Sequence, residues 1–105
     1  MLQKFQESLS SGQKSASALI VSGHTHLSGI EVITNGVNDA VVTIYDSQTG
    51  ANGPVLCVLT VTGVDNYGGR IWMYPIECNT GLYVTVSGTG ASYIAEYLKP
   101  SPAIV

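Results

Sequence analysis

The sequence predicts an all-β fold: an antiparallel two-sheet β-sandwich, jelly-roll-like or immunoglobulin-like, with seven or eight strands. Three observations support this fold class. Short runs rich in Val, Ile, Thr and Tyr recur along the chain, at a spacing of roughly ten to fourteen residues. Clusters of Gly, Asn, Asp and Pro separate these runs, as turns require. After residue 15 no segment has a convincing helical period, which disfavours alternating strands and helices.

Seven strands are expected, at residues 17–21, 27–34, 40–46, 55–62, 70–74, 82–87 and 92–98, and residues 76–78 could add an eighth. Gly29 inside the second run suggests a β-bulge. The dipeptide Asn35-Gly36 that follows is a strong turn signal. The run 55–62 is the most continuously apolar of the set, which predicts a strand buried on both faces at the centre of a sheet.

The glycine-rich segment 88–90 is expected to be a hairpin turn that joins the last two strands edge to edge. The strand before it alternates, with Leu82, Val84 and Val86 on one face. A phosphate-binding loop would need a helix N-terminus after its glycines. Residues 92–98 alternate like another strand instead, so a chain reversal is the better interpretation.

The chain of 105 residues is long enough for one domain. We divide it into an N-terminal arm (1–15), a sandwich domain (16–98) and a C-terminal tail (99–105). The apolar spacing in the arm would allow a brief amphipathic helix, and two prolines make the tail extended. We expect both ends to become ordered on a neighbouring molecule. Their expected contact residues are Leu2, Phe5, Leu9, Ala103, Ile104 and Val105.

The charge pattern excludes two classes of partner. Charged residues make up 10% of the chain and the net charge is −3, against about 25% charged residues in a typical domain. No Lys or Arg lies between Lys14 and Arg70. Neither nucleic acid nor an anionic membrane is therefore expected as a partner. The N-terminus lacks the features of a signal peptide, so we expect assembly in the cytosol, with proteins or sugars as partners.

His24 and His26 are the candidate metal ligands, because residues at i and i+2 of an extended segment point to the same face. A histidine pair is more typical of a polar turn at the edge of a loop, and that is the favoured interpretation. A symmetric oligomer that repeats the pair around its axis is the only route to a metal site that the sequence suggests, and we expect no cofactor. Cys57 and Cys78 are expected to be small buried hydrophobes, although a cross-strand disulfide stays open.

No catalytic motif is present in the sequence. A glycosidase needs two facing carboxylates, but the carboxylates are scattered over strand ends and turns, where such groups accept backbone hydrogen bonds. The residues concerned are Glu31, Asp39, Asp46, Asp65, Glu77 and Glu96. We therefore expect no enzyme. Among the aromatic residues, Tyr67 is expected to be exposed in a loop as a contact residue. Tyr83, Tyr93 and Tyr97 are expected to share one sheet face.

A sequence pattern extends over residues 27–97, about two thirds of the chain. It begins with LSGIEVITNGVNDAVVTIYDSQTGANGPVL, continues through an aromatic strand, and ends with NTGLYVTVSGTGASYIAEY. This pattern resembles small all-β virion proteins of tailed bacteriophages, which serve as head decoration or cement proteins, head fibres, or neck and tail accessory modules. Such proteins are typically trimeric and lack enzymatic activity.

The resemblance implies a non-enzymatic capsid decoration protein that stabilises the phage head by bridging capsomers. It implies a homotrimer, with the major capsid protein or other virion proteins as partners, located in a virion assembled in the host cytoplasm. The alternative is a carbohydrate-binding module of a fibre, tail or neck. In that case Tyr67 and Trp72 would be the aromatic residues that stack on sugar.

Overall fold

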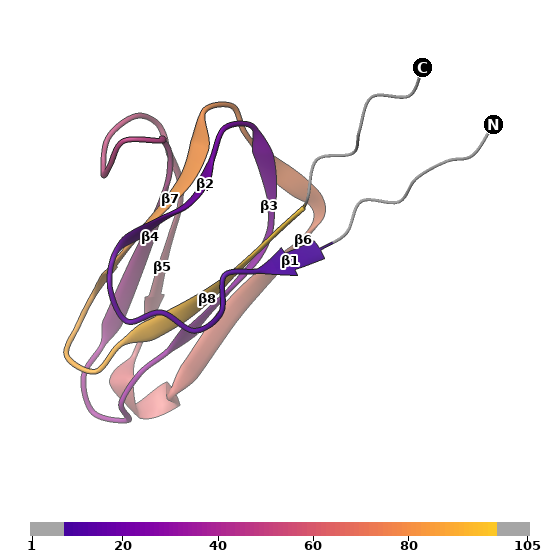
Figure 1. Cartoon of the computed structure of the whole chain (residues 1–105). Helices are drawn as coiled ribbons and strands as arrows, with labels where there is room; N and C mark the ends of the chain where they lie inside the picture. Colours follow the sequence, from indigo (N-terminus) through magenta and orange to yellow (C-terminus); the bar gives the residue numbers. More distant parts are fainter. Residues whose placement is uncertain (1–7, 99–105) are drawn as a thin grey trace, which may run out of the picture.

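The structure is a computed structural model that describes residues 8–98, and it consists of two four-stranded antiparallel sheets packed face to face (Figure 1). The all-β sandwich prediction is confirmed. The strands are β1 (Ser8–Ser10), β2 (Ala18–Ser22), β3 (Thr25–Ile33), β4 (Ala40–Asp46), β5 (Val55–Val61), β6 (Tyr67–Cys78), β7 (Gly81–Ser87) and β8 (Ser92–Leu98), with a 3-10 turn η1 (Gly63–Asp65) between β5 and β6. Within residues 8–98 no helix is long and apolar enough to cross a membrane.

The strand order identifies the sandwich as a jelly roll. One sheet has the order β1-β8-β3-β6 and the other β2-β7-β4-β5. The chain thus forms four nested antiparallel pairs, β4 with β5, β3 with β6, β2 with β7 and β1 with β8. This double winding of eight strands over two sheets is the jelly-roll arrangement.

The glycine turn at residues 88–90 is not a hairpin turn. It connects β7 in one sheet to β8 in the other, so the two strands do not pair, and the hairpin prediction is wrong. Both glycines have positive φ, +116° at Gly88 and +73° at Gly90. A Cβ at Gly88 would lie 2.2 Å from the Asp39 carbonyl oxygen, and one at Gly90 would lie 2.7 Å from the Asn35 Cβ. The turn therefore packs tightly against the β3–β4 connection, which also crosses between the sheets.

Three further predictions need correction. β5 is an edge strand, not a central one. Tyr93 is fully buried and its hydroxyl donates a hydrogen bond to the Ala16 carbonyl (2.9 Å), whereas Tyr83 lies in the other sheet, so no common tyrosine face exists. Leu9 lies in β1, which pairs with β8. The sheet thus extends into the segment expected to be an arm, and the brief helix does not reach Leu9.

The core lies between the sheets and is built from alternate residues of every long strand. Its largest fully buried apolar side chains are Tyr93, Leu27, Ile30, Ile44, Leu82, Val32, Val42 and Val84. Cys57 and Cys78 are both buried in it as free thiols, as expected. Burial raises the pKa of the Cys78 thiol to about 11, since a thiolate would lose its hydration there.

A buried carboxylate fastens the end of β4 to the β6–β7 turn. Asp46 accepts hydrogen bonds from the backbone N–H groups of Asn79 (3.0 Å), Thr80 (2.8 Å) and Gly81 (3.3 Å), and from the Thr80 hydroxyl (3.0 Å). Burial alone would raise the pKa of Asp46, but the hydrogen bonds from Thr80 and Asn79 outweigh it, so the pKa is lowered. The carboxylate thus acts as a charged clamp between the end of β4 and the β6–β7 turn.

Candidate functional site

The most irregular part of the molecule is the middle of β6, an edge strand of its sheet. In its ladder with β3, Ile71 pairs with Gly29 and Ile76 pairs with Leu27. Residues 72–75 of β6 therefore lie opposite the single residue Ser28. β3 also slips by one residue against β8 at the same place, which confirms the bulge predicted at Gly29. A large bulge on an edge strand redirects side chains away from the regular pleat.

Three large apolar side chains in and next to the bulge are exposed, and we call them the β6 ridge: Ile71, Met73 and Tyr74. They are 81%, 86% and 83% exposed. Trp72 between them is half-buried and packs against the core, so it holds the bulge in place. Pro75 has no N–H to offer to an added strand. The ridge thus presents large apolar side chains to a partner beside a position that cannot donate a backbone hydrogen bond.

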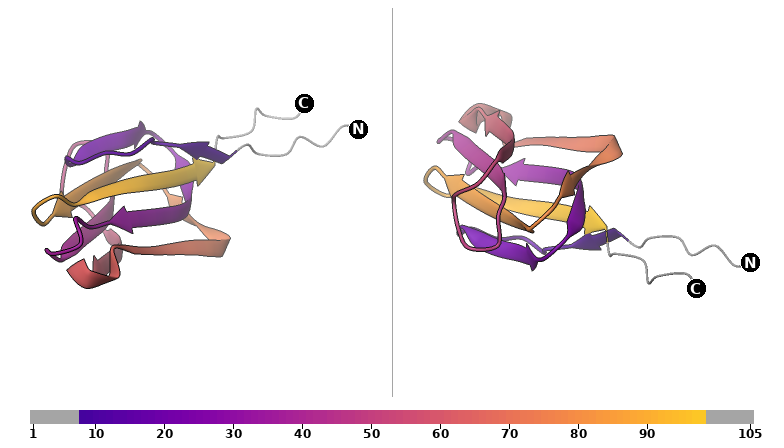
Figure 2. Two further views of the ribbon diagram at one scale, coloured as in Figure 1. Left: turned by 90° about the horizontal axis from the view of Figure 1, so that it is seen from below. Right: turned by 90° about the horizontal axis from the view of Figure 1, so that it is seen from above.

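The ridge lies on the same side of the sandwich as the edge of the second sheet. β5 and β6 are the edges on this side, joined through η1, and β1 and β2 are the edges on the other (Figure 2). Val55 and Val58 of β5 are each 54% exposed. Both edge strands on this side of the sandwich therefore carry exposed apolar residues.

A shallow depression of about 240 Å³ lies over Gly69 and is lined by Ile30, Glu31, Tyr67, Gly69, Arg70 and Ile71. Tyr67 is exposed, as predicted, but it is the first residue of β6 rather than a loop residue. Its hydroxyl donates a hydrogen bond to the Glu31 carboxylate (2.9 Å). That bond to Glu31 raises the pKa of Tyr67, because ionisation would place two negative charges together.

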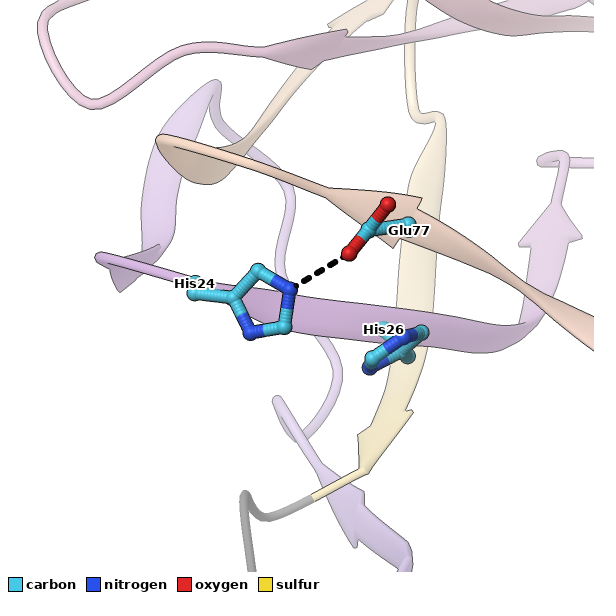
Figure 3. Close-up of side chains that lie close together, drawn as sticks. All are labelled: His24, His26 and Glu77. Atoms are coloured by element: carbon cyan, nitrogen blue, oxygen red, sulfur yellow. Dashed lines mark hydrogen bonds and ion pairs between the residues drawn. The ribbon is translucent and has the colours of Figure 1, made fainter.

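The two histidines meet a third polar group at the other end of β6. His24 precedes β3 and His26 lies in it. The His24 ring points to Glu77, and the His26 ring lies beside them on the same side of the sheet (Figure 3). The His24 Nε2 lies 2.8 Å from the Glu77 Oε2. The two imidazole rings meet edge to face, with centroids 5.1 Å apart. One ligand atom from each residue can be chosen so that all three lie within 4.8 Å of one another.

Sequence reasoning found the histidine pair but missed Glu77. Glu77 is the direct cross-strand partner of His26 in the β3–β6 ladder, and a pairing between residues so distant in the chain leaves no local signal. The other carboxylates behave as expected in two cases: Asp39 accepts a hydrogen bond from the Gly63 N–H (2.8 Å), and Asp46 is the loop clamp.

The predicted contact residues are only partly visible. Leu9 is half-buried in β1. Leu2, Phe5, Ala103, Ile104 and Val105 lie outside the described residues. Their role as contacts stays a prediction.

Comparisons with known protein families, with curated proteins and with solved structures found no match. Function therefore has to be inferred from three features of the fold itself. These are the β6 ridge, the depression beside Tyr67 and the cluster of His24, His26 and Glu77.

Proposed function

We propose that the chain is a non-enzymatic structural protein of a tailed-bacteriophage particle, a capsid decoration protein that acts as a homotrimer and bridges capsomers. The β6 ridge carries this proposal. It would form the contact between copies of the chain, while the terminal segments would contact the major capsid protein or other virion proteins. The chain would then be located in the virion after assembly in the host cytoplasm.

The size of the ridge fits the centre of an interface. Three large side chains bury roughly 400 Å² when they are covered, taking aromatic residues at about 150–250 Å² each as a guide. A stable interface needs about 800 Å² from each partner. Val55 and Val58, exposed on the neighbouring edge strand β5, would add apolar area if the contact extends around the edge of the sandwich. A polar rim rich in Ser, Thr and Gly would complete the surface.

The fold and the charge are compatible with this role. Jelly rolls are common in viral capsid proteins and in lectins, although a fold by itself does not determine a function. The low charge of the chain reduces the desolvation penalty when large surfaces become covered. A small domain also gains stability from an assembly that binds only its folded state.

The test replaces the ridge with polar residues. We expect the wild-type chain to be a trimer by light scattering and to co-sediment with capsids of the phage that encodes it. The variant I71S/M73S/Y74S should be monomeric, because the apolar contact between copies is gone. It should also bind capsids much more weakly, because three sets of terminal segments no longer bind together. Val37→Ser is the matched control, since Val37 is 75% exposed but lies in the β3–β4 connection. A wild-type chain that is monomeric and absent from particles in electron micrographs would refute the proposal.

A carbohydrate-binding module is the second candidate, supported by the depression beside Tyr67. Its volume of about 240 Å³ is below the roughly 300–1,000 Å³ of most ligand pockets, so at most a small sugar unit would fit. Trp72 is half-buried against the core, which leaves Tyr67 as the main stacking surface. Glycan-array binding that is lost in Tyr67→Ala and kept in Tyr74→Ala would favour this candidate. Capsid binding that is lost in Tyr74→Ala and kept in Tyr67→Ala would favour the decoration protein.

A further inference from the structure

We infer that His24, His26 and Glu77 form a surface site for a divalent transition-metal ion of the zinc type. The site is separate from the β6 ridge and does not depend on the proposed function. It uses two imidazole nitrogens and one carboxylate oxygen from two neighbouring strands (Figure 3). Water would complete the coordination of the ion.

The backbone holds both histidines toward the same side. Thr25, between them, is fully buried, and its hydroxyl donates a hydrogen bond to the Leu98 carbonyl (2.9 Å). Because successive residues of a strand point to opposite faces, an inward Thr25 forces His24 and His26 outward together. His26 pairs directly with Glu77 across the β3–β6 ladder, which places their Cβ atoms about 5 Å apart.

Hydrogen bonds between neighbouring turns support the site. The Gly23 N–H, next to His24, donates a hydrogen bond to the Thr80 carbonyl (2.9 Å). Thr80 itself is fixed by the buried Asp46 carboxylate. The turn before His24 and the β6–β7 turn that follows Glu77 are therefore tied to each other and to β4. Ligands held by such supporting contacts lose little freedom when an ion binds.

The distances need only side-chain adjustment to fit an ion. Tetrahedral zinc, with bonds of about 2.0–2.1 Å to nitrogen and oxygen, places its ligand atoms roughly 3.3 Å apart. The His24 Nε2 and Glu77 Oε2 are 2.8 Å apart, and one donor atom from each of the three residues lies within 4.8 Å of the others. The His24 Nε2 and the Glu77 Oε2 must move slightly apart, and the His26 side chain must turn toward them. The His24 and Glu77 side chains are 49% and 57% exposed, so they have room to move and the ion has an open path.

The donor set selects the class of ion. Imidazole nitrogens suit zinc, copper, nickel and cobalt, whereas calcium and magnesium require oxygen ligands. Two histidines and one glutamate leave at least one coordination position open, as in zinc sites that bind water or another ligand. The thiols do not compete for the ion, since Cys57 and Cys78 are both buried.

The test uses the untagged full chain, because its sequence has only two histidines and a histidine tag would obscure them. After removal of metal with a chelator, calorimetric titration with Zn²⁺ should show one ion bound per chain. Each of His24→Ala, His26→Ala and Glu77→Gln should lower the affinity at least about tenfold. Cobalt bound in place of zinc should give visible absorption bands that H24A/H26A lacks.

Glu31→Gln is the matched control. Glu31 is a partly exposed carboxylate of β3, the strand that carries His26, and it lies outside the cluster. It should bind zinc like the wild type, and thermal unfolding without metal should show that all variants are folded. Saturable binding that depends on all three ligands supports the site. An absence of saturable binding, or an affinity unchanged in His26→Ala and Glu77→Gln, overturns it and leaves a simple His24–Glu77 hydrogen bond.

Discussion

The loops that cross between the two sheets, at the ends of the sandwich, differ from the β6 ridge on its side. The difference lies in what their residues contact. At the crossings, Gly88 lies against the Asp39 carbonyl and Asp46 accepts four hydrogen bonds from the β6–β7 turn. On the ridge, Ile71, Met73 and Tyr74 are each more than four-fifths exposed. The first region is explained by folding, whereas folding alone gives no reason for large apolar residues in the second.

This difference separates two kinds of constraint on one chain. Substitutions at the crossings should lower the free energy of unfolding and affect function only through it. Substitutions on the ridge should leave the fold intact and alter association. The four predictions below are ordered from the largest expected effect on stability to the smallest.

Gly88→Ala should have the largest effect. The residue has φ +116°, and a Cβ would lie 2.2 Å from the Asp39 carbonyl oxygen. Backbone strain and the collision together should lower the free energy of unfolding by about 4 kcal/mol. Urea denaturation measures this, with Thr89→Ala in the same exposed turn as the control. If the two variants are equally stable, the turn does not constrain the packing of the two crossings.

Asp46→Ala should come next, at about 3 kcal/mol, because it removes a charged acceptor from three backbone N–H groups near the β6–β7 turn. Chemical denaturation should show the loss. Hydrogen exchange at Asn79, Thr80 and Gly81 should become faster than in the wild type. Unchanged exchange at these amides would show that the clamp is not needed to hold the turn.

The Asp46 clamp should also respond to pH. Its pKa in the folded chain lies below the ordinary value of 3.8, so its contribution is complete above that value and is lost as the pH falls through the folded pKa. The stability difference between the wild type and Asp46→Asn should therefore be constant near neutral pH and shrink below pH 3.8. Denaturation curves over an acid series would show this, and a difference that grows in acid would contradict the sign.

The ridge variant I71S/M73S/Y74S should have the smallest effect on stability, within about 0.5 kcal/mol for each exposed position. Its main effect should be on association: light scattering should give the molecular mass of a monomer instead of a trimer. Thermal unfolding at a dilution where the wild type dissociates compares the two folds without the contribution of association. If the ridge variant unfolds as easily as Gly88→Ala, the ridge is part of the folding core and the comparison fails.

Seven of the eight described strands could be located from the sequence, because alternation and turn residues are local signals. β1 was not predicted, and β6 is one longer strand, Tyr67–Cys78, where 70–74 and a separate 76–78 were expected. The membership of the strands in sheets could not. The 88–90 turn has the composition of a hairpin, yet it crosses between sheets, because the partner of a strand depends on tertiary packing. β5 is apolar enough for a central position but lies at an edge, and its outward-facing Val58 remains exposed.

In the candidate sites, too, some residues could be predicted from local sequence and others depend on tertiary packing. The spacing of His24 and His26 identified them in the sequence, and Tyr67 was expected to be exposed. Glu77 became visible only through the β3–β6 ladder. The ridge depends on the bulge opposite Ser28, which no local pattern specifies. The sequence did mark the place, because apolar residues occupy successive positions before Pro75.

The nested pairing of the strands has a consequence for the order of folding. Among the eight strands that the structure describes, only β4 and β5 are neighbours both along the chain and in a sheet. Their hairpin therefore closes the shortest loop and has the smallest entropic penalty. Once it has formed, β3 and β6 lie at its ends, followed by β2 with β7 and β1 with β8. We expect folding to proceed outward from this hairpin, on the slow timescale of proteins with many long-range contacts.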